Sequence, residues 1–362
     1  RSNTTGGGNF GMGFFALYSN VSGSYNIAIG NSALQNNTTS NNLAIGGGAA
    51  VNNTTGGVIA IGYEALKDNT TGLNNTAIGL NSLWSNTTSS NNTAVGTQAL
   101  YYSTGQGNTA VGSKALIGNT EGQYNTGIGV NTLFGSTTTQ GNTAIGNNAL
   151  YSNGNTVTGL GAITGGSGYT NGTYTNVTMT TIPAAAPAAE FPVANITVSG
   201  GAVTAVTLVS GGAGVGQVTS LSATAAQIGG TGSGFSVLIT SFNPGGNYST
   251  AIGDSAAANQ RRGNANIAVG PHVALPDTAA GKQLNIGNVI FGTGTYDGTS
   301  MSSTATSDSR VSIGTNTQPA SAILTLSSTD KGFLPPRMTG SQAEAIASPA
   351  EGLIIYSTDG SG

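Results

Sequence analysis

A chain of 362 residues is long enough to bury a large core, but only 6% of its residues are charged and 6% are aromatic, whereas 59 are glycine. Globular enzymes have roughly a quarter charged residues, so this composition argues against an ordinary enzyme core. The net charge of -3 offers no basic surface to nucleic acid, no run of about 18 apolar residues could insert into a membrane, and the lack of cysteine excludes disulfides and thiolate metal sites.

A short repeat occupies the first part of the chain. The tripeptide Ala-Ile-Gly or a close variant recurs every 16 or 17 residues, after a degenerate first copy that ends at Gly13. The glycines that end the regular copies are Gly30, Gly46, Gly62, Gly79, Gly96, Gly112, Gly129 and Gly146. A small apolar pair such as Ala33-Leu34 follows most of them, and then a polar turn rich in Asn and Thr. Each unit is therefore expected to form a strand, a tight corner, a second strand and a turn.

Units of this length are too short to form a free-standing sheet. Stacked at about 4.8 Å per coil, they pair each backbone with the coils above and below, which predicts an all-β fold built on a parallel β-roll or β-solenoid. Glycine after isoleucine fits a corner with positive φ. We expect Ala, Ile and Leu to fill a thin core, with side-chain ladders of Asn and Thr. Because thin cores are marginal, three chains around a common axis are predicted to share an apolar stripe; the alternative is a monomeric solenoid.

The pattern Asn-x-Ala-Ile-Gly-x-x-Ala-Leu resembles the head repeats of trimeric autotransporter adhesins and related repeats in phage tail fibres. The resemblance covers roughly residues 9–155 and resumes later in the chain. In both families such repeats imply a trimeric β-roll, so the resemblance independently implies a homotrimer.

The repeat is interrupted once. The gap from Gly146 to Gly253 is 107 residues instead of 16 or 17, so residues 156–244 are predicted to be inserted into one turn as a small β-domain. Alternation predicts strands at Val193–Val198, Val203–Leu208 and Phe235–Thr240, separated by glycine turns. Glycine-rich runs at 165–169 and 211–215 indicate two related halves. The segment resembles Gly-Ser-Gly-Tyr-Thr-Asn-Gly-Thr-Tyr modules of marine phage structural proteins, and 183–192 is expected to be a surface loop.

The rest of the chain divides into three predicted parts after the shaft of residues 1–155 and the insertion. Repeats resume over 245–290, and 291–328 forms a neck. The final part, 329–362, contains Gly-Phe-Leu-Pro-Pro-Arg-Met-Thr at 332–339 and resembles a distal tail-fibre module, here expected to be truncated. After Val311-Ser-Ile-Gly314, strands are predicted at Ala322–Leu326 and Leu353–Tyr356. Ser341 and Glu344 form a possible capping box for a short helix that ends before Pro349.

Few residues have the chemistry that catalysis requires. Glu64, Lys67 and Asp68 lie together but are expected to form a solvated turn. A polysaccharide-cleaving spike needs two carboxylates at a defined separation, and no spacing distinguishes Asp254, Asp277 and Asp297. The single His272 has no neighbouring second metal ligand. We therefore predict no catalytic residues, no metal site and no cofactor.

Several residues are candidates for contacts. Arg261-Arg262 could meet an anionic glycan, although an exposed loop is the simpler interpretation, and Arg337 is expected to hold a subunit contact. Aromatic side chains near corners and outer turns could stack on sugars or cover neighbouring coils. These are Tyr63, Trp84, Tyr101, Tyr102, Tyr124 and Phe134. The receptor-binding residues themselves are not predicted.

The combined prediction is a non-enzymatic, structural and adhesive fibre, most simply a phage tail fibre on the virion that attaches to a host. Its expected partners are two further copies of itself, a host-surface glycan or protein receptor, and other tail or fibre proteins, with no nucleic acid and no membrane insertion. The alternative is a bacterial surface adhesin or extracellular filament. A glycan depolymerase is a third possibility.

Overall fold

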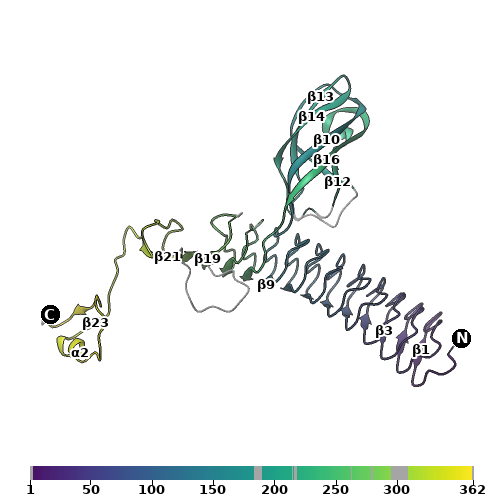
Figure 1. Ribbon diagram of the computed structural model, residues 1–362, viewed down its shortest axis with the longest axis horizontal. Coiled ribbons are helices and arrows are strands. Elements are labelled where there is room, and N and C mark those ends of the chain that lie inside the picture. Colours follow the sequence, from purple (N-terminus) through teal and green to yellow (C-terminus); the bar gives the residue numbers. More distant parts are fainter. Residues whose placement is uncertain are drawn as a thin grey trace.

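The structure is a computed structural model of the chain. It describes residues 3–182, 190–213, 215, 218–261, 263–278, 280–294 and 309–360. The fold is nearly all β. Figure 1 shows a long, narrow shaft of stacked coils, a β-unit that stands out from its side, and a C-terminal segment that extends beyond its far end.

One sheet of fifteen short strands runs along the shaft. Its first nine strands are β1 Phe10–Met12, β2 Ile27–Ile29, β3 Leu43–Ile45, β4 Ile59–Ile61, β5 Thr76–Ile78, β6 Thr93–Val95, β7 Thr109–Val111, β8 Thr126–Ile128 and β9 Thr143–Ile145. The sheet continues with β17 Thr250–Ile252, β18 Ile267–Val269, β19 Gln283–Ile286, β20 Ile290–Thr293, β21 Arg310–Ile313 and β22 Leu324–Leu326. From β1 to β19 the strands are parallel and each copy pairs with its equivalent, as in Ala28 with Ala44. The predicted parallel β-solenoid is therefore confirmed.

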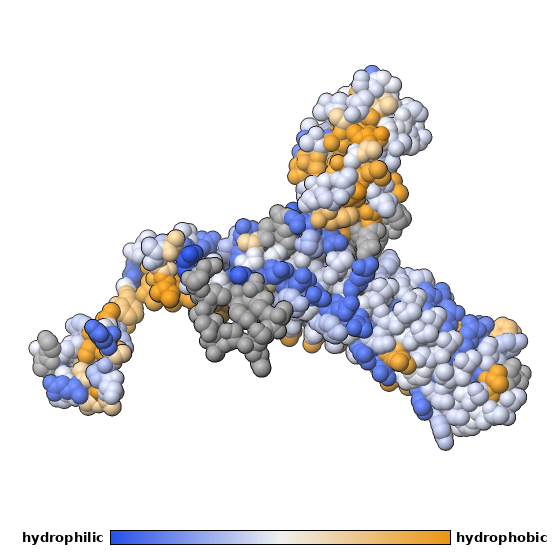
Figure 2. All heavy atoms as spheres, in the orientation of Figure 1, coloured by the Kyte–Doolittle hydropathy of each residue, from blue (hydrophilic) through white to orange (hydrophobic). Residues whose placement is uncertain are grey.

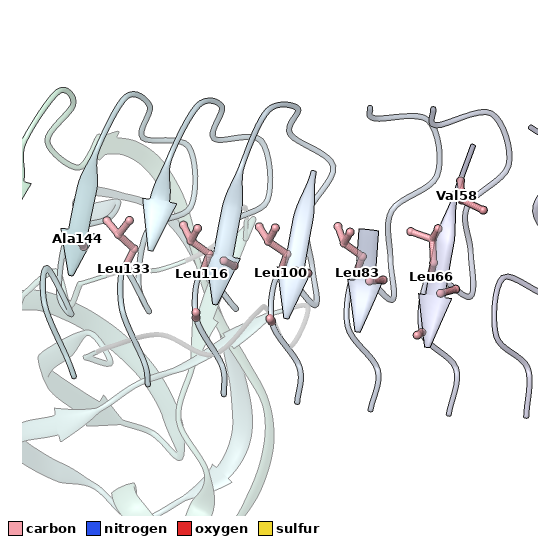
Figure 3. Packing of buried hydrophobic residues seen from close by; sticks show 14 of the residues in the cluster. Val58, Leu66, Leu83, Leu100, Leu116, Leu133 and Ala144 are labelled. Carbon is pink, nitrogen blue, oxygen red and sulfur yellow. The ribbon is translucent and has the colours of Figure 1, made fainter. Parts of the chain in front are cut away.

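The shaft's core is narrower than the sequence indicated. The middle residue of each repeat strand points inward, and those that are alanine, such as Ala94, are fully buried. The leucine of the following half-coil fills the remaining space, and Figure 3 shows Leu66, Leu83, Leu100, Leu116 and Leu133 in a row, one per coil. The isoleucines do not belong to this core, so the expectation that they fill it was wrong. Because the strand alternates, Asn and Ala share the inner side, and Thr and Ile share the outer side.

The second half of each coil is not a strand, contrary to expectation. Alternate residues there have positive φ, such as Gln98 at 58° and Leu100 at 51°. Hydrogen bonds to the next coil persist, since the backbone N–H of Leu100 donates to the carbonyl of Ala115 at 3.0 Å. A positive φ costs a non-glycine residue about 1–2 kcal/mol, and complete burial of the leucine offsets that cost.

Buried asparagines form a ladder that continues the backbone pairing. The side-chain oxygen of Asn92 accepts the backbone N–H of Asn108 at 2.9 Å, and Asn108 accepts that of Asn125 at 3.0 Å. The Asn108 amide N–H also donates to the carbonyl of Gly122 at 2.8 Å. Each asparagine thereby bonds to polar backbone groups of the next coil, and the backbone N–H that it accepts would otherwise be buried without a partner.

Replacing Asn108 with alanine is expected to lower the free energy of unfolding by about 1–3 kcal/mol, because the buried N–H of Asn125 loses its partner and the carbonyl of Gly122 keeps only its bond from Asn119. Chemical denaturation followed by circular dichroism measures this. The control is Asn36→Ala, which removes an exposed amide bonded only to Asn52 and is expected to change stability by less than about 0.5 kcal/mol. Equal losses in the two variants would contradict the role of the ladder.

The projecting unit is a two-layer β-structure. Its elements are β10 Thr156–Tyr169, β11 Gly172–Thr178, β12 Thr180–Ile182, β13 Val193–Ser199, β14 Ala202–Ser210, β15 Ser220–Ser222, α1 Ala225–Ile228 and β16 Gly230–Asn243. One sheet has the order β10-β16-β15-β12 and the other β11-β13-β14. Both contribute to a shared core that includes Ile196, Leu221 and Phe235. The three strands expected in this region are present, and α1 was not expected.

The unit is inserted into the polar turn of one coil. In an ordinary coil, the amide of Asn69 donates to the carbonyl of Gly72 at 3.0 Å. In the interrupted coil, Asn153 donates to Gly246 at 2.9 Å, although 93 residues separate them. The shaft then resumes without a register shift, because β9 pairs directly with β17. The hydrogen bond between Asn153 and Gly246 therefore joins the two ends of the insertion, as the equivalent bond closes the turn of an ordinary coil.

The glycine runs of the projecting unit do not mark two related halves. Residues 165–168 lie inside β10, where Gly165 pairs with Phe235, rather than in a turn. Residues 211–213 lie in a loop after β14, where Ala213 bridges Glu190, and Gly214 is outside the described residues. The expected surface loop also falls largely outside them, at 183–189.

The C-terminal segment contains a parallel strand pair and one short helix. The pair consists of β23 Arg337–Met338 and β24 Tyr356–Ser357. The helix, α2 Gly340–Glu344, is capped by Thr339 with Gln342 at its third position, so the capping box lies two residues before the predicted one. The predicted strand at Ala322–Leu326 is shorter in the structure, and that at Leu353–Tyr356 is shifted, with only Tyr356 in β24.

Candidate assembly face and binding surfaces

An apolar stripe runs along the outer side of the shaft's sheet. It is formed by the third strand residue of each coil, which points away from the alanine core. Its members are Met12, Ile29, Ile45, Ile61, Ile78, Val95, Val111, Ile128, Ile145, Ile252, Val269 and Ile286. At about 4.8 Å per coil the stripe is about 50 Å long. We call this set the outer stripe.

The residues that the structure describes leave the outer stripe partly open to solvent. Val111, Ile128 and Ile145 are 37%, 40% and 38% exposed. Figure 2 shows a different picture on the shaft face toward the viewer, where residues are mostly hydrophilic or neutral and apolar ones appear in isolated spots. Met12, Ile252 and Ile286 are exposed as well, and the other six members are half-buried. A long row of aliphatic side chains that are exposed or half-buried indicates an interaction surface, because single surface hydrophobes are common but contiguous ones are not.

A second apolar region lies where the shaft meets the C-terminal segment. A hollow of about 750 Å³ is lined by Val289, Ile313, Leu326, Phe333 and Leu334, together with polar residues of the same segment. Phe333 and Leu334 are 65% and 72% exposed. A cluster of exposed apolar side chains of this kind indicates an interaction surface.

The opposite half of the coil carries a row of large side chains. The residue after each buried leucine points outward, and in six successive coils it is Lys67, Trp84, Tyr101, Ile117, Phe134 and Tyr151, which we call the outer row. Trp84 and Tyr101 are stacked with ring centroids 5.2 Å apart. Phe134 and Tyr151 are stacked at 4.9 Å. These aromatic side chains therefore cover neighbouring coils, which was the simpler of the two interpretations.

The first members of the outer row are joined by a carboxylate. The indole N–H of Trp84 donates to Glu64 at 2.9 Å, and Lys67 forms an ion pair with the other Glu64 oxygen at 3.0 Å. The Lys67 ammonium also lies 5.0 Å from the Trp84 ring centroid. The hydrogen bond from Trp84, assisted by Lys67, holds the pKa of Glu64 below its ordinary value. The three groups thus join neighbouring coils through one hydrogen bond and one ion pair.

Acidification is expected to open this cluster. Because the carboxyl pKa is lower in the folded chain, the ionised carboxylate stabilises the fold. This stabilisation is fully present at a pH above the unfolded-state pKa of about 4.3, and it is lost as the pH falls through the folded-state pKa. Trp84 is the single tryptophan, so its fluorescence should change in that acidic range. In Glu64→Gln the acid transition should disappear, with a stability change of less than about 1 kcal/mol because the pair is partly exposed. An unchanged transition in the variant would contradict the assignment.

Among the remaining charged candidates, the structure brings His272 and Asp254 together. His272 is 3.3 Å from Asp254 on the exposed surface. Arg261 pairs with Glu190 at 2.6 Å, which ties the projecting unit to the shaft. Asp277 supports a local turn through the backbone N–H of Ala280, and Arg262 and Asp297 lie outside the described residues.

Arg337 and Asp68 complete the set of predicted candidates. The Arg337 guanidinium lies 5.3 Å from the ring of Tyr356, so within this chain it joins β23 to β24. The backbone N–H of Asp68 donates to the carbonyl of Trp84, which places Asp68 in the coil-to-coil pairing. Among the described residues, no group of three or more His, Asp or Glu side chains could hold a metal ion.

A recurring tyrosine contact was not predicted. The ring of Tyr124 covers Gly107 of the preceding coil, where an added Cβ would lie 2.7 Å from the ring. The amide of Gln106 donates to the Tyr124 hydroxyl at 3.0 Å. Gln140, Gly141 and Tyr248 repeat this arrangement across the insertion. The signal in the sequence was a Gln-Gly pair followed one coil later by tyrosine.

The comparisons with known proteins concern the C-terminal part. Residues 312–362 match the model of a protein family described as a phage tail like trimerisation region. No curated protein and no solved structure matches the chain. The match supports the prediction of a homotrimeric, structural protein of the tail-fibre type, while the named repeat type remains a prediction. Of the described helices, none combines the length and apolar character needed to cross a bilayer.

Proposed function

We propose that the chain forms a trimeric structural fibre of a phage tail, in which three shafts pack their outer stripes around a common axis. The main observation in support is that one chain has both a lengthwise apolar stripe and a region similar to trimerisation domains. The outer stripe runs along the shaft from β1 to β19, and a trimerisation-type region follows it at residues 312–362.

The geometry of a three-chain assembly explains the exposed aliphatic side chains. Rotational symmetry places the outer stripe of each chain against the outer stripes of the other two chains. The same repeated residues therefore form the contact along the whole shaft. Removing apolar area from water contributes about 25 cal/mol per Å². The C-terminal hollow beside Phe333 and Leu334 extends the apolar contact beyond the end of the repeats. The narrow alanine core of each shaft is thereby supplemented by a second apolar interface.

The assembled fibre is proposed to work as an adhesive device rather than as an enzyme. Three rigid copies of the shaft would hold three projecting units at fixed positions, away from the particle. Several weak contacts made by one rigid body raise the overall affinity through effective concentration. A host-surface glycan or protein is the proposed partner of these contacts, and the virion tail is the proposed location.

The mass of the purified chain in solution tests the assembly directly. Analytical ultracentrifugation is expected to give three times the chain mass of 35.4 kDa. Electron microscopy should show a thin rod with three side projections at one level, because each chain has one insertion. A monomer that remains dispersed at micromolar concentration would overturn the proposal. Binding of the trimer to host cells, compared with non-host cells, tests the adhesive role.

A further inference from the structure

The outer row ends abruptly at Tyr151. Phe134 covers one face of the Tyr151 ring, since the two rings are 4.9 Å apart and nearly parallel at 14°. The next coil places Ala258 at the equivalent position, where its carbonyl accepts the backbone N–H of Ser152. Alanine has no ring to continue the stack. A hollow of about 340 Å³ therefore lies beside Tyr151, with Ala258 as part of its lining.

Two amide side chains line the rest of this hollow. Asn131 and Asn148 come from successive coils, and the Asn131 amide N–H donates to the Asn148 oxygen at 3.2 Å. This hydrogen bond orients both amides next to the aromatic ring. The pair presents an amide oxygen on Asn131 and an amide NH2 on Asn148, so it can both accept and donate. None of the four lining residues carries a charge.

We propose that this hollow binds one uncharged hexopyranose residue of a host-surface glycan. One face of a pyranose ring presents C–H groups that pack on an aromatic plane, and its hydroxyls at the ring edge both donate and accept hydrogen bonds. Tyr151 supplies the plane, and Asn131 and Asn148 supply the edge partners. The volume lies at the lower end of the range of about 300–1,000 Å³ for ligand pockets, which fits a single ring.

The position of the hollow is compatible with the trimer. Its residues belong to the turn half of the coils, whereas the outer stripe belongs to the strands, so packing through the outer stripe leaves the hollow open. Tyr151 also lies two residues before Asn153, where the projecting unit leaves the shaft (Figure 1). The inference rests on the proposed adhesive function, because the trimer would carry three copies of a weak sugar site that act together.

The test fills the hollow without removing any lining group. In Ala258→Tyr the new ring should stack on Tyr151, as Tyr151 stacks on Phe134, and cover its open face. Saturation-transfer NMR and calorimetry with lactose, maltose and cellobiose, and with sialyllactose as an anionic comparison, are expected to show binding of a neutral sugar by the wild-type chain. We expect at least tenfold weaker binding in Ala258→Tyr. The control is Val51→Tyr, which adds the same side chain at the equivalent position of a distant coil and should bind normally.

A second variant covers the case in which Ala258→Tyr does not fold. Tyr151→Leu keeps an apolar side chain against Phe134 but removes the aromatic plane, and it should lose binding to the same extent. Wild-type protein that binds none of the neutral sugars, or variants that bind as well as wild type, would overturn the inference. Sedimentation of the same samples separates this result from the proposed function. If the wild type and the variants are all trimers and all attach to host cells, the sugar site is rejected but the fibre is not. If the wild-type protein is a monomer, the trimeric fibre itself is rejected.

Discussion

Replacing Gly46 with alanine is expected to destabilise the shaft by about 2–6 kcal/mol. Gly46 has φ of +133°, which L-residues rarely adopt, and an added Cβ would lie 2.4 Å from the carbonyl oxygen of Gly62 in the next coil. A strained backbone conformation costs about 1–3 kcal/mol and overpacking costs about 1–3 kcal/mol more. The backbone of the next coil cannot retreat without breaking its own pairing. Urea denaturation followed by circular dichroism measures the loss.

The adjacent glycine provides a matched control. Gly47 lies outside the left-handed region, and a Cβ there would meet the ring of Tyr63 at 3.5 Å and the carbonyl oxygen of Asn31 at 4.0 Å, which are ordinary contact distances. Gly47→Ala is therefore expected to change stability by less than about 0.5 kcal/mol. If both variants lose the same amount, the corner glycines are required for some reason other than close approach of the coils.

Replacing Val95 with glutamate is expected to abolish the trimer while the single shaft stays folded. Val95 is a member of the outer stripe, and the neighbouring Ala94 supplies the core of that coil. In a trimer, the variant would place three carboxylates near one axis, away from water and without partners. Such burial costs several kcal/mol or more. Sedimentation should show monomers, and circular dichroism should show the same β-structure as in the wild type.

Gln98→Glu in the same coil controls for the added charge. Gln98 is half-buried in the turn half of the coil, beyond the Gly96 corner, where another coil already has Glu64. This variant should remain trimeric. A Val95→Glu protein that sediments as a trimer would show that the outer stripe does not face the other chains. A variant that loses its β-structure would instead show that the stripe supports the single shaft.

The period of the shaft followed from sequence because it depends on local rules. Gly46 and its equivalents recur at each coil, since a corner with positive φ and a close neighbour accepts no other residue. The direction of the isoleucines did not follow. Along each strand, the Ala positions and the Ile positions could both belong to a core. The Ala side is buried because Asn108 and its equivalents lie on the same side, and their amides pair with the backbone of the next coil.

The binding surfaces were harder to predict than the coils. The Trp84, Tyr101 and Phe134 side chains were recognised as candidates, but their contacts depend on which residue lies one coil away. The hollow beside Tyr151 exists only because Ala258, 107 residues later, occupies the equivalent position. Likewise Asn153 and Gly246 form one turn although the projecting unit separates them.

The sequence by itself determined that this protein is a stack of short coils with an insertion, because backbone pairing and glycine corners impose a fixed repeat length. Only the tertiary structure decided which side of each strand is buried, where the outer stripe lies and which rings remain uncovered. Such features depend on contacts between equivalent positions of successive coils. The repeat length fixes which positions of successive coils meet. The residue types at those positions, which can be far apart in the chain, determine what kind of contact forms.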